Sequence, residues 1–211
     1  MEPTKIRLYR ITHLENLSLL CREKGLWCGR ESVERGSPYL SIGNVDLTRS
    51  RSGVLVPCSE KGCLGDYVPF YFSPRPVMLY NIFRRTANTY GGGQEAIVHL
   101  ITNVAAIQRT QIPFAYTDRH AYVKTRRFYD TPSSFDRLDW DAIRSRDWQN
   151  TTAAPDRKER KQAEFLAYRF VPLVCFQGVG VFSQSQKQDV EEIFREFGIT
   201  LPVQVKQDWY Y

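Results

Sequence analysis

Glu164 stands between a basic segment and an apolar one. Residues 157–161 read RKERK, and the apolar sequence FLAY begins directly after Glu164. A carboxylate at the start of an apolar strand is partly removed from water, which costs free energy unless a partner compensates it. Acids in such positions often take part in chemistry, as general bases or as stabilisers of positive charge. The competing interpretation is a structural ion pair between Glu164 and Arg51 or Arg10.

Other residues of catalytic type give weaker signals. His99 lies within an apolar stretch, where a buried structural histidine is the simpler interpretation. His120 follows TDR and can simply end a strand, while Arg49 and Arg51, in TRSRSG, have the composition of a solvated loop. The sequence GGGQ is typical of a turn. Motifs of the GxGxxG, HExxH, GxSxG and Walker types are absent from the sequence.

The composition favours a partner that carries phosphates. The chain has a formal net charge of +6 and contains 12 Tyr, 12 Phe and 4 Trp. Lys and Arg gain free energy when phosphates release their counterions, and aromatic rings can stack on bases. An ordinary basic protein is the alternative. Five cysteines without CxxC spacing and only three histidines argue against a zinc site, so we expect no metal.

Length and targeting signals predict one cytoplasmic domain. A chain of 211 residues is long enough to bury its own core, and we expect a single domain over residues 1–211. The sequence MEPTKIRLYRITH lacks the apolar segment of a signal peptide, and no apolar run reaches membrane length. We therefore expect reduced thiols and no membrane association.

The elements that must position these residues are strands mixed with short helices. Thr12 and Glu15 have capping-box spacing before an apolar helical stripe over 14–21 that Gly25 can end, and Pro69 predicts an edge strand or a bulge. Residues 29–66 look irregular. This irregular order predicts an α+β fold. We expect strands at 5–12, 66–74, 95–102, 113–120, 164–172, 179–183 and 201–207, and further helices at 76–85, at 134–146 with Ser133 or Ser134 as cap, and at 185–198.

Eight short sequences that span the chain resemble one family. In chain order they are YRITHLENL, IGNVDLTRSRSG, DYVPFYFSPRPVMLY, GGQEAIVHL, PFAYTDRHAY, LDWDAIRSRDW, KQAEFL and DWYY. Together they resemble DarT, the toxin family of the DarT–DarG toxin–antitoxin systems. The resemblance implies an ADP-ribosyltransferase-like fold, with mixed central β-sheets, short helices and a long turn-turn loop before the catalytic glutamate. It also implies transfer of ADP-ribose from NAD to a base, usually thymidine, in single-stranded DNA.

The resemblance assigns residues to NAD and to catalysis. Glu164 and Arg51 match the catalytic glutamate and the functional arginine of the family, and the loop 32–53 would cover the dinucleotide. Some relatives carry His where this chain has Arg10, so either Arg10 or His13 could contact the nicotinamide ribose. The NAD-binding residues implied are Arg10, Ile11, Thr12, His13, Leu19 and Arg51.

The resemblance also implies the DNA-binding face and a protein partner. Basic side chains before Glu164 would follow phosphates, while Trp148 or Tyr80 would stack on bases. We expect a monomer whose partner is a macrodomain antitoxin, DarG. The DNA-binding residues implied are Arg75, Met78, Tyr80, His120, Arg146, Trp148, Lys158, Arg160, Lys161 and Gln162.

Two other classes of function stay open at this point. A transferase of the same fold could act on guanine, RNA or protein, because basic loops do not separate these substrates. A nucleic-acid-binding module without catalysis would show the same charge and the same aromatic residues.

Overall fold

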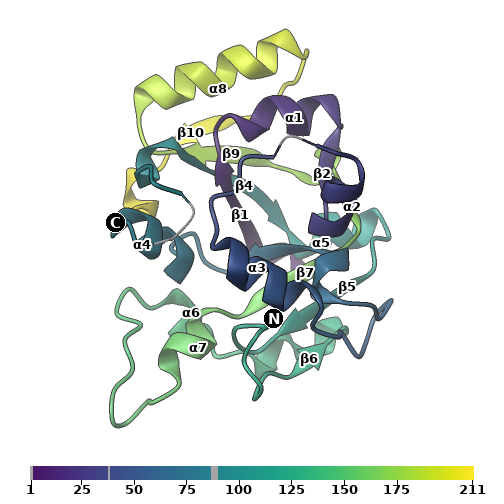
Figure 1. Cartoon of the computed structure of the whole chain (residues 1–211), viewed down its shortest axis with the longest axis vertical. Coiled ribbons are helices and arrows are strands. Elements are labelled where there is room, and N and C mark those ends of the chain that lie inside the picture. The colour runs from purple at the N-terminus through teal and green to yellow at the C-terminus, as the bar shows by residue number, and fades with distance from the viewer. Residues whose placement is uncertain (1, 38, 87–89) are drawn as a thin grey trace.

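A mixed sheet of eight strands forms the centre of the molecule in the computed structural model, which describes residues 2–37, 39–86 and 90–211 (Figure 1). The strand order is β10-β9-β4-β1-β3-β7-β5-β6, and β9 with β10 is the parallel pair. The expected α+β class is confirmed. The strands are β1 (Arg7–His13), β3 (Tyr67–Tyr71), β4 (Ile97–Asn103), β5 (Phe114–Thr117), β6 (Phe128–Tyr129), β7 (Glu164–Tyr168), β9 (Gly178–Val181) and β10 (Val203–Val205).

The sheet is loosely joined between β1 and β3. β1 pairs with β4 along its whole length but with β3 only at Tyr9 and Tyr71, whereas β3 pairs with β7 over its five residues. Pro69 pairs with Leu166 of β7, and its carbonyl accepts a hydrogen bond of 3.4 Å from the Arg10 guanidinium. Of the two alternatives that Pro69 indicated, an edge strand or a bulge, the edge strand is therefore wrong, because β3 lies between β1 and β7. A proline is tolerated in this central strand because β1 forms no ladder with it.

A second sheet of two strands continues from the end of β7. β2 (Gly25–Trp27) pairs with β8 (Phe170–Pro172), and Arg169, with φ of 55°, turns the chain from β7 into β8. The run predicted as one strand at 164–172 is thus two strands in different sheets. Gly25 is required here because a Cβ atom would lie 2.4 Å from the Phe170 ring.

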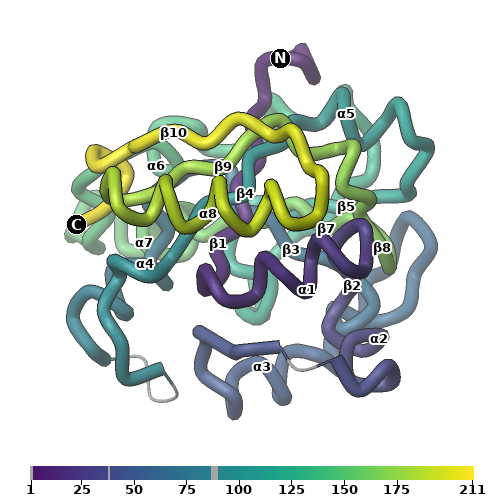
Figure 2. Tube along the Cα trace, turned by 90° about the horizontal axis from the view of Figure 1, so that it is seen from above, coloured from purple at the N-terminus to yellow at the C-terminus, as the bar shows by residue number. Residues whose placement is uncertain are grey.

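Short helices surround the sheet, and α1 and α8 lie together on one side of it (Figure 2). In α8, Ser183 and Gln186 form a capping box, and Val190 and Phe194 are buried, as its apolar stripe predicts. The helices are α1 (Asn16–Arg22), α2 (Gly29–Glu34), α3 (Val45–Ser52), α4 (Val77–Phe83), α5 (Val104–Arg109), α6 (Trp140–Arg144), α7 (Arg157–Lys161) and α8 (Gln184–Glu196).

Three local predictions are wrong. Residues 29–66 are not irregular throughout, because α2 and α3 lie within them. The capping box of Thr12 and Glu15 does not form, since the backbone N–H of Glu15 instead donates to His13 Nδ1. The single helix expected at 134–146 is a 3-10 helix followed by α6, and Asp139 caps α6 in place of a serine.

Apolar side chains fill both faces of the sheet. The largest cluster includes Leu8 and Phe165 and reaches α1 and α8, whereas a second cluster gathers Ile11, Leu79 and Tyr210 beneath α4. Ile11 is therefore a core residue. If it contacts NAD, as the family resemblance implies, it does so through its backbone.

Candidate active site

The carboxylate of Glu164 is buried at the start of β7. Its side chain is 2% exposed and shares a face of the sheet with Tyr71, its directly opposed partner on β3. The backbone N–H of Ala121 donates to Oε1 at 3.2 Å, and Nη2 of Arg51 donates to Oε2 at 2.5 Å. The Glu164 N–H donates to Thr117 Oγ1. The carboxylate is thus held by two donors while it stays out of bulk water.

Arg51 reaches this carboxylate from the last turn of α3. Asn44 begins the helix by accepting a hydrogen bond from the Leu47 N–H at 2.9 Å. The Arg51 side chain is 20% exposed, whereas that of Arg49 is 79% exposed and lies 3.9 Å from Asp46. The contact between Arg51 and Glu164 also shows that the structural ion pair considered for Glu164 does form. A structural and a catalytic role are compatible here, because a buried carboxylate needs a cation to stay charged.

Opposing effects set the pKa of Glu164. Burial alone would raise it, but the charge of Arg51, followed by that of His120 and by the hydrogen bonds from Arg51 and Ala121, holds the pKa of Glu164 below its ordinary value. Burial is also the largest effect on His120 and lowers its pKa. At pH 7 the site therefore contains an ionised carboxylate beside a neutral histidine.

This depressed pKa makes part of the stability pH-dependent. A group whose pKa is lower in the folded chain contributes stability above its unfolded pKa, about 4.5 for Glu164, and loses it as the pH falls through the folded value. We expect the native chain to lose stability on acidification more steeply than Glu164→Gln, which cannot titrate there. Urea unfolding of both proteins from about pH 6 to pH 3 checks this. Parallel curves would contradict the pKa assignment.

Tyr71 joins the pair of Arg51 and Glu164 to the first strand. Burial, and next to it the charge of Glu164, raises the pKa of Tyr71 to about 12, while Arg10 and Arg51 act in the opposite sense. Its hydroxyl donates to Met78 Sδ at 3.3 Å. The charges of Arg10, Arg51 and Glu164 are therefore all close enough to Tyr71 to shift the pKa of its hydroxyl. The sequence quoted Tyr71 only within a motif, and nothing local to it indicates this position.

The other residues predicted for NAD lie along the first strand and helix. Thr12 Oγ1 shares a hydrogen bond of 2.9 Å with the Tyr39 hydroxyl, and both residues line a small cavity of about 20 Å³ together with Leu19. His13 is buried, and its ring packs edge-on against Tyr90 at 5.5 Å. On the same strand, the charge of Arg10 acts on Tyr71, which is the strand partner of Glu164.

Arg75, Tyr80 and Trp148, three of the residues predicted to contact DNA, lie around Tyr211, the last residue of the sequence. These four residues are called the aromatic wall. The Arg75 guanidinium lies 4.1 Å from the centre of the Tyr211 ring, and Tyr80 packs edge-on against that ring at 5.1 Å. Trp148 Nε1 donates to the Tyr211 hydroxyl at 3.3 Å, and the hydroxyl donates to the Arg75 carbonyl at 3.2 Å. Gln94 holds the Tyr211 backbone through both ends of its amide. Two quoted sequences, GGQ and DWYY, thus meet here.

Lys161 occupies a structural position rather than an open one. Its side chain belongs to α7, the residue is 4% exposed, and its ammonium donates to the carbonyls of Ile143 at 2.7 Å and Ser145 at 2.9 Å. Burial, with help from the charge of Arg75, lowers the pKa of Lys161 to about 8. This geometry does not favour direct contact between Lys161 and DNA. Instead the lysine braces the segment that ends in Arg146, which is exposed.

The rest of the basic segment is divided between pairing and exposure. Arg160 forms an ion pair with Asp139, and Gln162 donates to the Lys158 carbonyl at 3.0 Å. Lys158 is exposed, with its ammonium 5.7 Å from the centre of the Trp148 ring. Of the cations predicted for DNA in this segment, Lys158 is therefore the one whose charge is open to a phosphate.

The described residues contain neither a metal-binding cluster nor a membrane-spanning helix. Residues 2–37, 39–86 and 90–211 contain no group of three or more His, Cys, Asp or Glu side chains arranged to hold a metal ion. Among the same residues, every helix is too short or too polar to span a bilayer.

Known proteins resemble this chain over its whole length. The family model described as "ssDNA thymidine ADP-ribosyltransferase, DarT" matches residues 9–211. A DNA ADP-ribosyl transferase of Thermus sp. (strain 2.9) is 37% identical over 212 residues, covering 100% of this chain and 97% of the relative. The solved structure of Thermus sp. 2.9 DarT in complex with ADP-ribosylated ssDNA has a TM-score of 0.92 at 36% identity, covering 100% of this chain and 98% of that one.

A further structure, Thermus sp. 2.9 DarT in complex with NAD+, has a TM-score of 0.88 at 35% identity and covers 100% of this chain and 99% of that one. The ADP-ribosyltransferase fold expected from the sequence is thereby confirmed. With Glu164 and Arg51 paired in a buried site and the match extending from β1 to the last residue, the chain belongs to the DarT family of ssDNA thymidine ADP-ribosyltransferases.

Proposed function

We propose that this chain transfers ADP-ribose from NAD to a thymine base in single-stranded DNA and releases nicotinamide. The observation that carries the proposal is the ion pair of Arg51 with the buried Glu164, at 2.5 Å, in a chain of this family. NAD is a substrate here. Residues 1–211 form one transferase domain in this proposal.

The carboxylate of Glu164 acts on the bond that breaks. When the C–N bond between nicotinamide and ribose lengthens, C1′ of the ribose becomes electron-poor and the ring oxygen shares the positive charge. A fixed anion in a site with little water stabilises that charge more than it stabilises neutral ground-state ribose. Nicotinamide leaves with the bonding electron pair, and a nitrogen of the base attacks C1′ and gives up its proton to the Glu164 carboxylate.

The remaining residues assigned to the site position these groups. Arg51 keeps Glu164 ionised and supplies a guanidinium for a phosphate or for the deprotonated base. Arg10, Thr12, His13 and Leu19, with the Ile11 backbone, would hold the nicotinamide half of NAD. His120, neutral at pH 7, is available to hydrogen-bond the base.

The aromatic wall and Lys158 would hold the DNA. A single strand presents unpaired bases, so no base pair has to be opened before transfer. Arg75 and Lys158 would meet phosphates, while Tyr80 and Met78 offer apolar surface to a base. Trp148 is buried against Tyr80 at a centroid distance of 5.2 Å, so its contribution would be to support Tyr80. Direct contacts of Arg146, Arg160, Lys161 and Gln162 with DNA stay predictions, as do a monomeric state and a DarG antitoxin.

Removing the Tyr211 hydroxyl should weaken DNA use and spare NAD use. Tyr211→Phe keeps the ring beside Arg75 but loses the hydrogen bonds to Trp148 and to the Arg75 carbonyl. Since a net hydrogen bond contributes about 1 kcal/mol, we expect the KM for an oligonucleotide to rise about fivefold, with the KM for NAD unchanged. Tyr210→Phe is the control, because its hydroxyl bonds within the core to the Ile97 carbonyl. Equal effects of the two variants on oligonucleotide KM would contradict the role of the wall.

Mass spectrometry of a defined oligonucleotide after incubation with NAD tests the proposed function. One added ADP-ribosyl group on a strand that contains thymine, and none on the same strand with thymine replaced, is the expected result. Labelled NAD offered to single-stranded DNA, RNA and protein in parallel separates the alternative acceptors. A strand that binds but is never modified would favour the non-catalytic binding module.

A further inference from the structure

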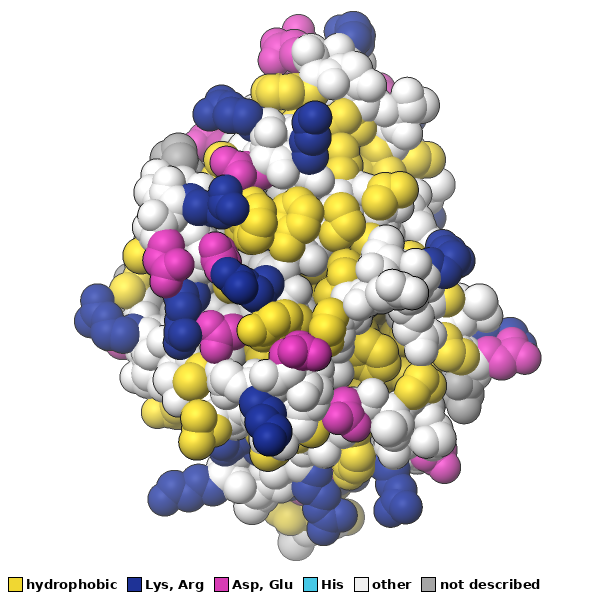
Figure 3. Space-filling model, turned by 90° about the vertical axis from the view of Figure 1, so that its right-hand side faces the viewer, with side chains coloured by type: hydrophobic (Ala, Val, Ile, Leu, Met, Phe, Trp, Pro, Cys, Tyr) yellow, Lys and Arg dark blue, Asp and Glu magenta, His cyan; other side chains and the backbone are white. Residues whose placement is uncertain are grey.

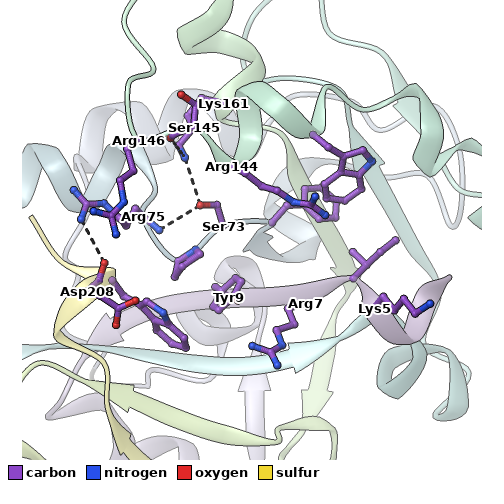
Figure 4. A pocket seen from close by; sticks show the side chains of 15 residues that line it. Lys5, Arg7, Tyr9, Ser73, Arg75, Arg144, Ser145, Arg146, Lys161 and Asp208 are labelled. Carbon is purple, nitrogen blue, oxygen red and sulfur yellow. Dashed lines mark hydrogen bonds between the residues drawn. The ribbon is translucent and has the colours of Figure 1, made fainter. Parts of the chain in front are cut away.

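A basic cavity of about 340 Å³ lies apart from the Glu164 site (Figure 4). β1 and the 3-10 helix before it form one side, α6 and the segment after it form the other, and the chain around Trp209 closes one end. Neither Arg51 nor Glu164 lines it, and Arg10 and His120 do not either. Its charged lining residues are Lys5, Arg7, Arg75, Arg144, Arg146, Lys161 and Asp208.

The lining is strongly unbalanced in charge. It holds six cations and one carboxylate, whereas the face shown in Figure 3 mixes cations with acids. Elsewhere arginines have close acids, as Arg119 has Asp118, Asp156 and Glu159 within 3.7 Å. Among the lining cations, Lys5 has a close acid, Glu2 at 2.9 Å, in a pair whose side chains are both exposed. Asp208 meets the Arg75 guanidinium through its carbonyl oxygen. The cavity is therefore a place where an anion would relieve repulsion among like charges.

Internal hydrogen bonds fix the shape of the cavity. Lys161 joins the carbonyls of Ile143 and Ser145, which flank Arg144, and its ammonium lies 3.4 Å from Ser73 Oγ. Arg75 Nη1 donates to the Tyr210 carbonyl at 2.5 Å. Two cations are thus held by backbone oxygens that carry no net charge, so they keep their positive charge uncompensated. Such a lining does not need to rearrange before it accepts an anion.

The cavity is connected to the reacting centre by two short chain segments. Ser73 lies two residues beyond Tyr71, which is opposite Glu164, and Lys161 lies three residues before Glu164. Rings of Tyr9, Trp140 and Trp209 line it as well, so a phosphate would find apolar surface for its sugar or base next to it. A volume of this size falls at the lower end of the range for small-molecule sites and suits one nucleotide unit.

We propose that this cavity binds a phosphate of the DNA strand outside the nucleotide that is modified. The inference rests on the proposed function, and it adds Lys5, Arg7 and Arg144 to the DNA-binding residues. Arginine is suited to the task because its planar guanidinium can donate two parallel hydrogen bonds to phosphate oxygens. The same chemistry would also accept free phosphate or a mononucleotide, which the experiment below separates from the strand.

Replacing single phosphates by neutral methylphosphonates along an oligonucleotide tests the proposal. In the native protein, we expect one particular linkage outside the modified nucleotide to be sensitive. A neutral methylphosphonate at that linkage should raise the KM for the oligonucleotide about fivefold to tenfold. In Arg7→Gln/Arg144→Gln the KM for the unmodified strand should already be raised by that factor, and neutralising the same linkage should add nothing. The slope of log binding constant against log salt should fall by about 0.7 for each lost contact with a single strand. The KM for NAD should not change.

Arg22→Gln/Arg195→Gln is the matched control, because it removes two exposed cations from α1 and α8 and none from the cavity. Equal losses in the two double variants, or a methylphosphonate effect that persists in Arg7→Gln/Arg144→Gln, would overturn the proposal.

Titration with inorganic phosphate and with thymidine monophosphate tests whether the cavity binds a free anion instead of the strand. If these compete with neither the strand nor its methylphosphonate forms, the strand is the ligand. If they bind the native cavity while no linkage responds, the cavity serves a free anion and the assignment to DNA is wrong. Strand binding measured by anisotropy without NAD keeps this test separate from failure of the transferase reaction.

Discussion

Glu164→Gln should reduce the transfer of ADP-ribose to DNA at least about a hundredfold. The substitution keeps the shape of the side chain and can still accept the hydrogen bond from the Ala121 N–H, but it removes the negative charge. Loss of one preorganised donor in an oxyanion hole typically costs about 10²- to 10³-fold in rate. A full charge opposite a developing cation, in a site where Glu164 is buried, should cost no less.

The same substitution tests whether the loss is chemical or structural. Breaking a buried pair by removing one partner destabilises a protein by about 3–5 kcal/mol. Arg51 retains a path to water because its side chain is 20% exposed, so we expect Glu164→Gln to fold with a lower midpoint of urea unfolding. The KM for the oligonucleotide and for NAD should change little while kcat collapses. Mass spectrometry of the oligonucleotide measures the rate, and urea unfolding measures the stability.

Glu159→Gln provides the control for Glu164→Gln. Glu159 belongs to the same basic segment, its side chain is 40% exposed, and it contacts Arg119 at 3.7 Å rather than Arg51. It should keep nearly native transfer activity. Comparable activity in Glu159→Gln and Glu164→Gln, with both folded, would remove Glu164 from the reaction.

The sequence predicts best those elements whose signals are local. In α8, Val190 and Phe194 of the predicted apolar stripe are buried, and Gly198, with φ of 64°, follows the helix as expected. Phe197, on the same stripe, is 38% exposed, and Ser183, which caps the helix, was expected to end the preceding strand. β4 and β7 are apolar runs bounded by polar residues, and both lie in the large sheet. Glu164 was distinguished for the same reason: an acid at the beginning of an apolar strand is a local anomaly that the fold turns into a buried carboxylate.

What the sequence did not predict depends on contacts between distant residues. α3 buries none of its residues, so no apolar periodicity marks it, and the segment was expected to be irregular. The partner of Arg51 lies 113 residues further along the chain. Lys161 differs from Lys158 only in the direction it takes from α7, toward carbonyls supplied by another segment. Residue type alone cannot show which cation of a basic run is buried.

The geometry of α3 also separates Arg51, the arginine that the family resemblance selects, from its neighbour Arg49. Successive helical residues are about 100° apart, so residues 49 and 51 differ by about 200° around the axis and face opposite sides. Arg51 faces Glu164, while Arg49 faces solvent beside Asp46. Arg51→Ala should therefore lower transfer about 10²-fold or more, whereas Arg49→Ala, with the same change in charge two residues away, should stay within about twofold of the native protein.

The pH dependence of Arg51→Ala identifies the cause of its loss. Without Arg51, burial is the dominant effect on Glu164, and its pKa should move from below its ordinary value to above it. Glu164 would then be largely protonated in acid, and the residual activity of Arg51→Ala should rise with pH between about pH 5 and 8 as the carboxylate ionises. The native protein and Arg49→Ala, in which Glu164 is already ionised, should share one flatter profile over that range.

Arg51→Lys keeps a cation near Glu164 and should restore the flatter profile. Its rate can stay low, because lysine lacks the planar fork of arginine. If Arg51→Ala is slow at every pH with the native profile, Arg51 acts on the substrate alone and does not maintain the charge of Glu164. If Arg49→Ala is the more damaging variant, the face of α3 that meets β7 has been assigned incorrectly.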